Sequence, residues 1–156
     1  MKPEIHLFII WENAYKFKDN FIKEINNKTY LSVIGKHEIT WNAFEENLTR
    51  FYRKRPVMSD KANRVGRGPF TLVVVEDNSP QYKERSTSKG KEIVNINIFD
   101  LKEEFREISG PPNDLIHATN NIIESNHDLT LLLGVNCSDY KKTKINKTLN
   151  IDIIGH

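Results

Sequence analysis

The chain is poor in cysteine and has no long apolar run. Cys137 is its one cysteine, so an internal disulfide cannot form, and no cysteine or histidine cluster has the spacing of a zinc site. No apolar segment approaches the roughly 20 residues that a transmembrane helix needs. The first residues also lack the apolar core of a signal peptide. These absences argue against a disulfide framework and a structural metal, and they predict a soluble, cytoplasmic protein with no membrane partner.

The chain also has almost no excess of charge of either sign. The chain has 23 Lys and Arg against 21 Asp and Glu, a formal net charge of +2. A balance this close gives no electrostatic argument for nucleic acid or an acidic membrane surface. With 156 residues, the chain is long enough for one core and too short for two. We expect one domain over residues 1–134 and a polar tail over residues 135–156.

Apolar periodicity predicts four strands that alternate with four helices. Strands are expected over residues 5–10, 29–41, 69–76 and 114–121, the second with a bulge at Gly35 and the third in the centre of the sheet. Helices are expected over residues 14–27, from residue 42 to before residue 56, through residues 101–108, and over 122–133. Asn42 and Glu45 have the spacing of a capping box. Residues 53–68 are expected to form a basic loop and residues 77–92 a mobile surface segment.

A helix between successive strands favours an α+β protein with helices packed on a sheet. The order and the short connections suit a ferredoxin-like βαββαβ core with a four-stranded antiparallel sheet and extra helices. The tail alternates through Leu149, Ile151 and Ile153. It suits a frayed terminus as well as it suits an edge strand or a subunit contact.

His117 is the most informative residue, because its segment predicts a strand that presents an imidazole and then turns into a helix. Alternation places Leu115, His117 and Thr119 on one face of that strand. An imidazole held at a strand end can act as a base, a metal ligand or a phosphate-accepting nucleophile. The alternative is a hydrogen-bonded structural histidine.

The order of elements and the segment Asp-Leu-Ile-His-Ala-Thr-Asn at 114–120 resemble nucleoside diphosphate kinase over about residues 5–133. In that family the strand histidine takes the γ-phosphate of a nucleoside triphosphate and passes it to a diphosphate. The family also carries a helix carboxylate eleven residues after the histidine, which here is Asp128. A phosphorylating imidazole needs such an acceptor to orient its second nitrogen. An exposed helix carboxylate is the alternative for Asp128.

The same resemblance implies phosphate-binding and base-stacking residues. Arg106, four residues before Gly110, is similar to the family's phosphate arginine, and Lys102 lies one turn earlier on the same helix face. Both could instead belong to a solvated ion-pair face. Tyr52 is the candidate for stacking on a base, beside Phe51, which continues an apolar stripe. Thr119 joins the candidate phosphate-binding residues.

Two cations of the family are missing. Trp11 stands where the family has a phosphate-binding lysine, and the segment that carries a second arginine has shrunk to residues 110–113. Stabilisation of a transferred phosphoryl group is mainly electrostatic, so the predicted chemistry is related to that of the family without being the same reaction. Replacements are sought in the basic loop, with Arg64 and Arg67 preferred. The wider set is Arg53, Lys54, Arg55, Lys61, Arg64 and Arg67.

Three functions are in view. The leading hypothesis is a divergent phosphotransferase that binds a nucleotide or another phosphorylated small molecule, with Mg²⁺ bridging phosphates and His117 as phosphate acceptor or general base. The second is a catalytically silent nucleotide-sensing or partner-binding module of the same fold. Nucleic-acid binding ranks last, because the aromatic strand signature of RNA-recognition modules is missing. The sequence leaves open a homo-oligomer and association with a larger enzyme.

Overall fold

The computed structural model describes residues 2–54, 58–142 and 149–151, the last group by backbone alone. The strands are β1 (Glu4–Ile10), β2 (Leu31–Trp41), β3 (Phe70–Asp77), β4 (Tyr82–Thr87), β5 (Gly90–Asn95), β6 (Ile116–Ala118) and β7 (Leu149–Ile151). The helices are the 3₁₀ helix η1 (Glu12–Phe17), α1 (Lys18–Asn27), α2 (Phe44–Phe51), α3 (Ser59–Val65), α4 (Ile96–Ser109), α5 (Ile122–Leu133) and α6 (Cys137–Tyr140).

The main sheet has the strand order β6-β1-β3-β2-β7. Its first four strands pair antiparallel, and β7 adds to the edge of β2 in parallel. With α1 between β1 and β2, and α4 between β3 and β6, this is the ferredoxin-like βαββαβ arrangement. The predicted fold class is therefore confirmed. The α2–α3 pair and the β4–β5 hairpin are insertions in this core.

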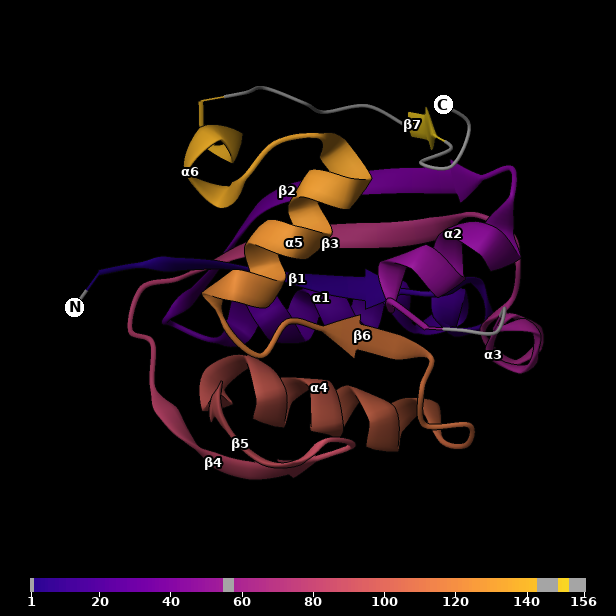
Figure 1. Cartoon of the computed structure of the whole chain (residues 1–156). Coiled ribbons are helices and arrows are strands. Elements are labelled where there is room, and N and C mark those ends of the chain that lie inside the picture. The colour runs from indigo at the N-terminus through magenta and orange to yellow at the C-terminus, as the bar shows by residue number, and fades with distance from the viewer. Residues whose placement is uncertain (1, 55–57, 143–148, 152–156) are drawn as a thin grey trace.

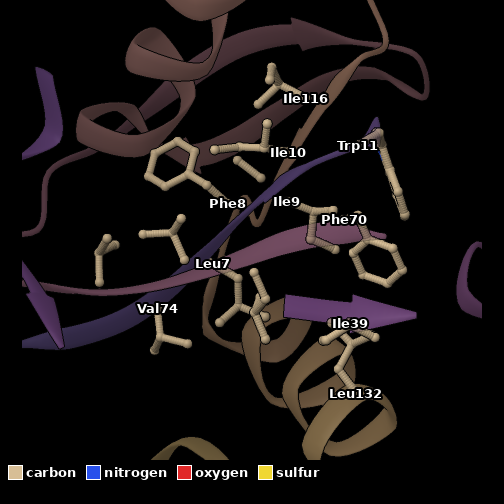
Figure 2. Close-up of a cluster of buried hydrophobic side chains, with 14 of the residues drawn as sticks. Leu7, Phe8, Ile9, Ile10, Trp11, Ile39, Phe70, Val74, Ile116 and Leu132 are labelled. Carbon is tan, nitrogen blue, oxygen red and sulfur yellow. The ribbon is translucent and has the colours of Figure 1, made fainter. Parts of the chain in front are cut away.

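Helices cover both faces of the sheet because its central strands are apolar on both sides. Phe8 of β1 contacts Phe105 of α4, whose ring stacks on Phe21 of α1 at 4.4 Å, so these helices share one face. Figure 1 shows α5 in front of β1 and β3, with α1 behind them. In Figure 2, Leu7 points to the side where Leu132 of α5 lies.

Several predicted elements need correction. The helix α2 has Ala43 at its N-cap position with no side-chain cap, so the capping box at Asn42 is wrong. Glu45 bonds to Ser59 and Arg67 instead. The basic loop contains α3, which buries Ala62 beneath its charged residues.

The segment 77–92 is also more ordered than expected, because residues 82–95 form the β4–β5 hairpin. The strand β4 has no buried side chain, so apolar alternation could not reveal it. The tail adds α6 and β7. Ile153, on which part of the tail prediction rested, lies outside the described residues.

Candidate functional site

Local structure places His117 and Asp128 on neighbouring elements. His117 is the middle residue of the edge strand β6 and lies opposite Ile9 of β1. The chain then enters α5, where the Asn121 side chain accepts a hydrogen bond from the Glu124 N–H at 2.9 Å. This N-cap fixes the start of the helix. Asp128 follows almost two turns later, on the side of α5 that meets β6.

The imidazole of His117 has a partner at each nitrogen. Its Nε2 lies 2.7 Å from Oδ2 of Asp128, and its Nδ1 lies 3.2 Å from the phenol oxygen of Tyr52. The rings of Phe51 and Tyr52 stand edge-on to the imidazole, with centroids at 5.1 and 5.4 Å. The His117 side chain is 16% exposed and that of Asp128 is 6% exposed. The spacing of eleven residues thus brings the two groups into hydrogen-bond contact.

Asp128 holds a second histidine, which the sequence reasoning missed. Its Oδ1 lies 2.8 Å from Nδ1 of His127, whose Nε2 accepts a hydrogen bond from Nε of Arg53 at 3.0 Å. The adjacent His127-Asp128 pair was visible in the sequence, but nothing local indicated that both side chains meet. Arg53 appeared there only as one of six basic residues.

The hydrogen-bond partners indicate which ring nitrogen of each histidine carries the proton. A guanidinium only donates, so Nε2 of His127 accepts and its Nδ1–H is given to Asp128. The same carboxylate accepts the Nε2–H of His117, which leaves Nδ1 of His117 to accept from the Tyr52 phenol. Burial, together with the charge of Asp128, raises the pKa of Tyr52, so the phenol keeps its proton. Each imidazole therefore has one N–H on Asp128 and one lone pair directed elsewhere.

Two cations gather around Asp114, just before β6. Nζ of Lys61 and Nη2 of Arg64 lie 3.3 and 2.8 Å from its Oδ2. Burial alone would raise the pKa of the Asp114 carboxyl, but the hydrogen bonds from Arg64 and the charge of Lys61 hold it below its ordinary value. The Lys61 ammonium also lies 4.9 Å from the Tyr52 ring centroid. The cluster thus reaches the side chain that covers His117.

Arg106 of α4 bonds to the backbone of β6. Its Nη2 donates to the carbonyl oxygen of Ile116 at 3.1 Å, and its Nη1 lies 3.5 Å from Glu103. Arg106 and Arg64 share a groove of about 730 Å³. The groove is lined by Arg64, Glu103, Arg106, Glu107 and residues 110–114. Its volume is within the ordinary range of small-molecule pockets, about 300–1,000 Å³.

Lys102 is placed differently from Arg106. It is 7% exposed, and its Nζ lies 4.2 Å from the Phe99 ring and 3.9 Å from Glu103. Burial, aided by the charge of Arg106, lowers the pKa of Lys102 to about 8. Lys102 is not among the residues that line the groove.

The structure does not bring Thr119 or Arg67 to this site. The buried hydroxyl of Thr119 lies 2.8 Å from Nδ1 of His6 and accepts from the Leu7 N–H at 3.2 Å. Arg67 donates to Glu45 at 2.8 Å from its Nε. Both side chains are thus engaged within the protein, and neither lines the groove.

Trp11, which stands where the resemblance would place a phosphate-binding lysine, packs in the hydrophobic core. It is fully buried, and its ring centroid lies 4.9 Å from that of Phe70 and 6.0 Å from that of Trp41. Of the remaining basic candidates, Lys54 is exposed and Arg55 lies outside the described residues. The cations that bond to Asp114 and Ile116, just before His117, come from α3 and α4.

Within residues 2–54, 58–142 and 149–151, no three His, Cys, Asp or Glu side chains are grouped to hold a metal ion. In the same residues, no helix is long and apolar enough to cross a membrane.

Fold and site together define a ferredoxin-like α+β protein with an imidazole oriented by a buried carboxylate. A groove lined by both arginines and carboxylates includes Asp114, three residues before that imidazole. No family model matches the chain, and no curated protein shows significant similarity to it. Among solved structures, the chain is similar to the nucleoside diphosphate kinase of Aquifex aeolicus in an orthorhombic crystal form. The identity is 20% and the TM-score 0.44, over 82% of this chain and 93% of the kinase chain.

Proposed function

We propose that this protein is a divergent phosphotransferase that accepts a phosphoryl group on Nδ1 of His117. The observation that carries the proposal is the 2.7 Å contact between Nε2 of His117 and Asp128. That contact orients the ring and leaves Nδ1 as its nucleophilic nitrogen.

In the proposed transfer, Nδ1 of His117 attacks the phosphorus of a phosphorylated donor. The N–P bond forms as the P–O bond to the leaving group breaks, and the leaving group departs with the electron pair. The ring then gains positive charge, which the Asp128 carboxylate stabilises through Nε2–H. The Tyr52 phenol has to release Nδ1 before the attack, because it donates to the same lone pair.

Positive charge for the phosphates of the donor would come from Arg64 and Arg106, which line the groove together with Glu103, Glu107 and Asp114, and from Lys61 beside it. Asp114 now pairs with Lys61 and Arg64. A phosphate that enters the groove therefore competes with Asp114 for Lys61 and Arg64. A nucleoside triphosphate suits a groove of this size, and Mg²⁺ bound to its phosphates would offset the remaining negative charge.

Incubation with γ-labelled ATP or GTP tests the proposal. We expect label that is lost in acid and retained in alkali, with fragmentation mass spectrometry placing it on His117. A His117→Asn variant should lose that site. Nucleotide binding would be measured by the rise in melting temperature that a bound ligand produces. A wild-type protein that binds the nucleotide but gains no such label would instead be a silent nucleotide-binding module.

The cations provide a matched comparison. Loss of one charge-assisted hydrogen bond to a transferred phosphate costs about 1.5–3 kcal/mol, roughly 10- to 100-fold in rate. We therefore expect Arg64→Gln to slow labelling by about that factor. Arg67→Gln is the control, because Arg67 is engaged by Glu45 away from the groove. Equal rates for the two variants would remove Arg64 from the proposed site.

A further inference from the structure

Asp128 accepts a hydrogen bond from each of two imidazoles. Its two oxygens lie 2.7 Å from Nε2 of His117 and 2.8 Å from Nδ1 of His127. The hydrogen bonds that make His117 a candidate nucleophile have equivalents at His127: an N–H held on a buried carboxylate and a lone pair on the opposite nitrogen. The side chain of His127 is also the more accessible, at 23% exposed against 16%.

A cation stands at the outward nitrogen of His127. Nε of Arg53 lies 3.0 Å from it, in an exposed hydrogen bond. A hydrogen bond exposed to water is easily exchanged, so phosphate oxygens can displace the guanidinium from the imidazole and then be bound by it. At His117 the equivalent position is held by the phenol of Tyr52, which carries no charge.

The end of α2 contacts both histidines through consecutive residues. Phe51 packs against both imidazoles, with ring centroids 5.1 Å from His117 and 6.3 Å from His127. Tyr52 bonds to the outer nitrogen of His117 and Arg53 to that of His127. Any movement that withdraws this segment exposes both lone pairs together.

We propose that His127 is a second phosphoryl acceptor that reacts through Nε2 and shares Asp128 with His117. This rests on the proposed function, because it assumes the same class of phosphorylated donor. Nε2 of His127 forms the N–P bond while the donor's P–O bond breaks and the leaving group takes the electron pair. The Nδ1–H stays on Asp128, and Arg53 offsets the charge of the new phosphoryl group.

The proposal predicts two chemically different products. His117 would carry phosphorus on Nδ1, whereas His127 would carry it on Nε2, because in each ring the other nitrogen holds the proton given to Asp128. The two phosphohistidine isomers can be distinguished by phosphorus NMR, and fragmentation mass spectrometry locates the residue.

The test compares wild type, His117→Asn, His127→Asn and the double variant after incubation with γ-labelled ATP or GTP. We expect wild type to contain both isomers, His117→Asn the Nε2 isomer on His127, His127→Asn the Nδ1 isomer on His117, and the double variant neither. Arg53→Gly should lower the His127 share of the label relative to the His117 share. Arg53 has a φ of 55°, a conformation that glycine adopts without strain, so this variant removes the guanidinium and leaves the turn intact.

The outcomes separate the two proposals. Label on His117 alone in wild type, with none in His117→Asn, would overturn the second acceptor and leave the proposed function standing. Absence of label from wild type as well would refute the proposed function itself. Mapping the wild-type protein gives the same decision if the His117→Asn variant does not fold.

Discussion

At the scale of single residues, the Tyr52 phenol is the first obstacle to chemistry at His117. It donates to the one nitrogen that the Asp128 contact leaves free, at 3.2 Å. A neutral hydrogen bond contributes about 0.5–1.5 kcal/mol, so its removal should speed labelling of His117 by roughly two- to tenfold. We therefore expect Tyr52→Phe to raise the initial rate, measured by quenched time points with γ-labelled ATP.

Tyr15→Phe is the control for that experiment, because the Tyr15 side chain is exposed and bonds only to Lys18 among the described residues. A slower reaction of Tyr52→Phe relative to this control would show that the phenol assists the transfer instead of covering the nucleophile.

Lys102 should make stability depend on pH. Its pKa is about 8 in the folded protein against 10.5 ordinarily, so between these values the unfolded chain binds more protons and the free energy of unfolding rises with pH. Below pH 8 the Lys102 amine is charged in both the folded and the unfolded protein, and the folded protein bears the whole cost of burying that charge. We expect Lys102→Met to raise the free energy of unfolding at neutral pH by about 1–3 kcal/mol. Urea titrations from neutral pH to about pH 10.5 would measure it.

The exposed Lys23→Met serves as the comparison for Lys102→Met. If both variants follow the same stability profile across that pH range, the buried amine is not the source of the dependence.

The residues of the site were predictable to different degrees. His117 and Asp128 lie on adjacent elements, so a fixed spacing along the chain was enough to pair them. Arg53 and His127 are 74 residues apart, and Tyr52 and His117 are 65 apart. Those contacts depend on how α2 packs across the sheet, which no local pattern specifies.

At the scale of elements, the bulge at Gly35 of β2 lies against Tyr140 of α6. The register between β2 and β3 shifts between Val33 and Gly35, which confirms the predicted bulge. A Cβ at residue 35 would lie 1.7 Å from the Tyr140 hydroxyl, which itself bonds to Nε2 of His37 at 2.7 Å. We expect Gly35→Ala to lower the free energy of unfolding by about 1–3 kcal/mol, measured by chemical denaturation.

A double-variant cycle checks that assignment. Tyr140→Phe removes the hydroxyl that the new Cβ would strike, so Gly35→Ala should cost less in that background. The same cost in both backgrounds would mean that the strain arises elsewhere in β2.

Elements with one apolar face were easy to predict, and polar ones were not. The helix α5 spans the predicted residues 122–133, and the central strand differs by one residue at each end. The hairpin β4–β5 is held by its own ladder and by contacts such as Arg85 to Asp100 at 2.9 Å. Backbone pairing between strands and polar contacts between elements leave no periodic apolar signal in the sequence.

At the scale of the whole molecule, a buried polar network joins β1 to β6 and α5. The Thr119 hydroxyl meets Nδ1 of His6, the Leu7 N–H and the Ser125 hydroxyl. Thr119→Val removes these hydrogen bonds and leaves the buried Leu7 N–H without its acceptor, which should cost about 1–3 kcal/mol of unfolding free energy. Thr119→Ser keeps the hydroxyl and should retain most of the stability. Denaturant titration of both variants measures the difference.

Labelling distinguishes this structural role from the phosphate role first predicted for Thr119. The folded Thr119→Val protein should still label His117, because the hydroxyl does not reach the groove lining. Full stability with loss of labelling would support the phosphate role.

The ferredoxin-like arrangement of the first four strands could be predicted because strands alternate with helices and the connections are short. For the tail, the alternation of Leu149 and Ile151 left an edge strand and a frayed terminus equally open. The structure has the edge strand, β7, which pairs with residues 39–41 of β2.

The central claim is that Nδ1 of His117 accepts a phosphoryl group. Its most direct test is phosphorus NMR combined with site mapping of the wild-type protein after incubation with a nucleoside triphosphate and Mg²⁺. The account predicts phosphorus bound to Nδ1 of His117, because its Nε2–H is committed to Asp128. Phosphorus on Nε2 of that residue, or no phosphohistidine in a protein that binds the nucleotide, would contradict it.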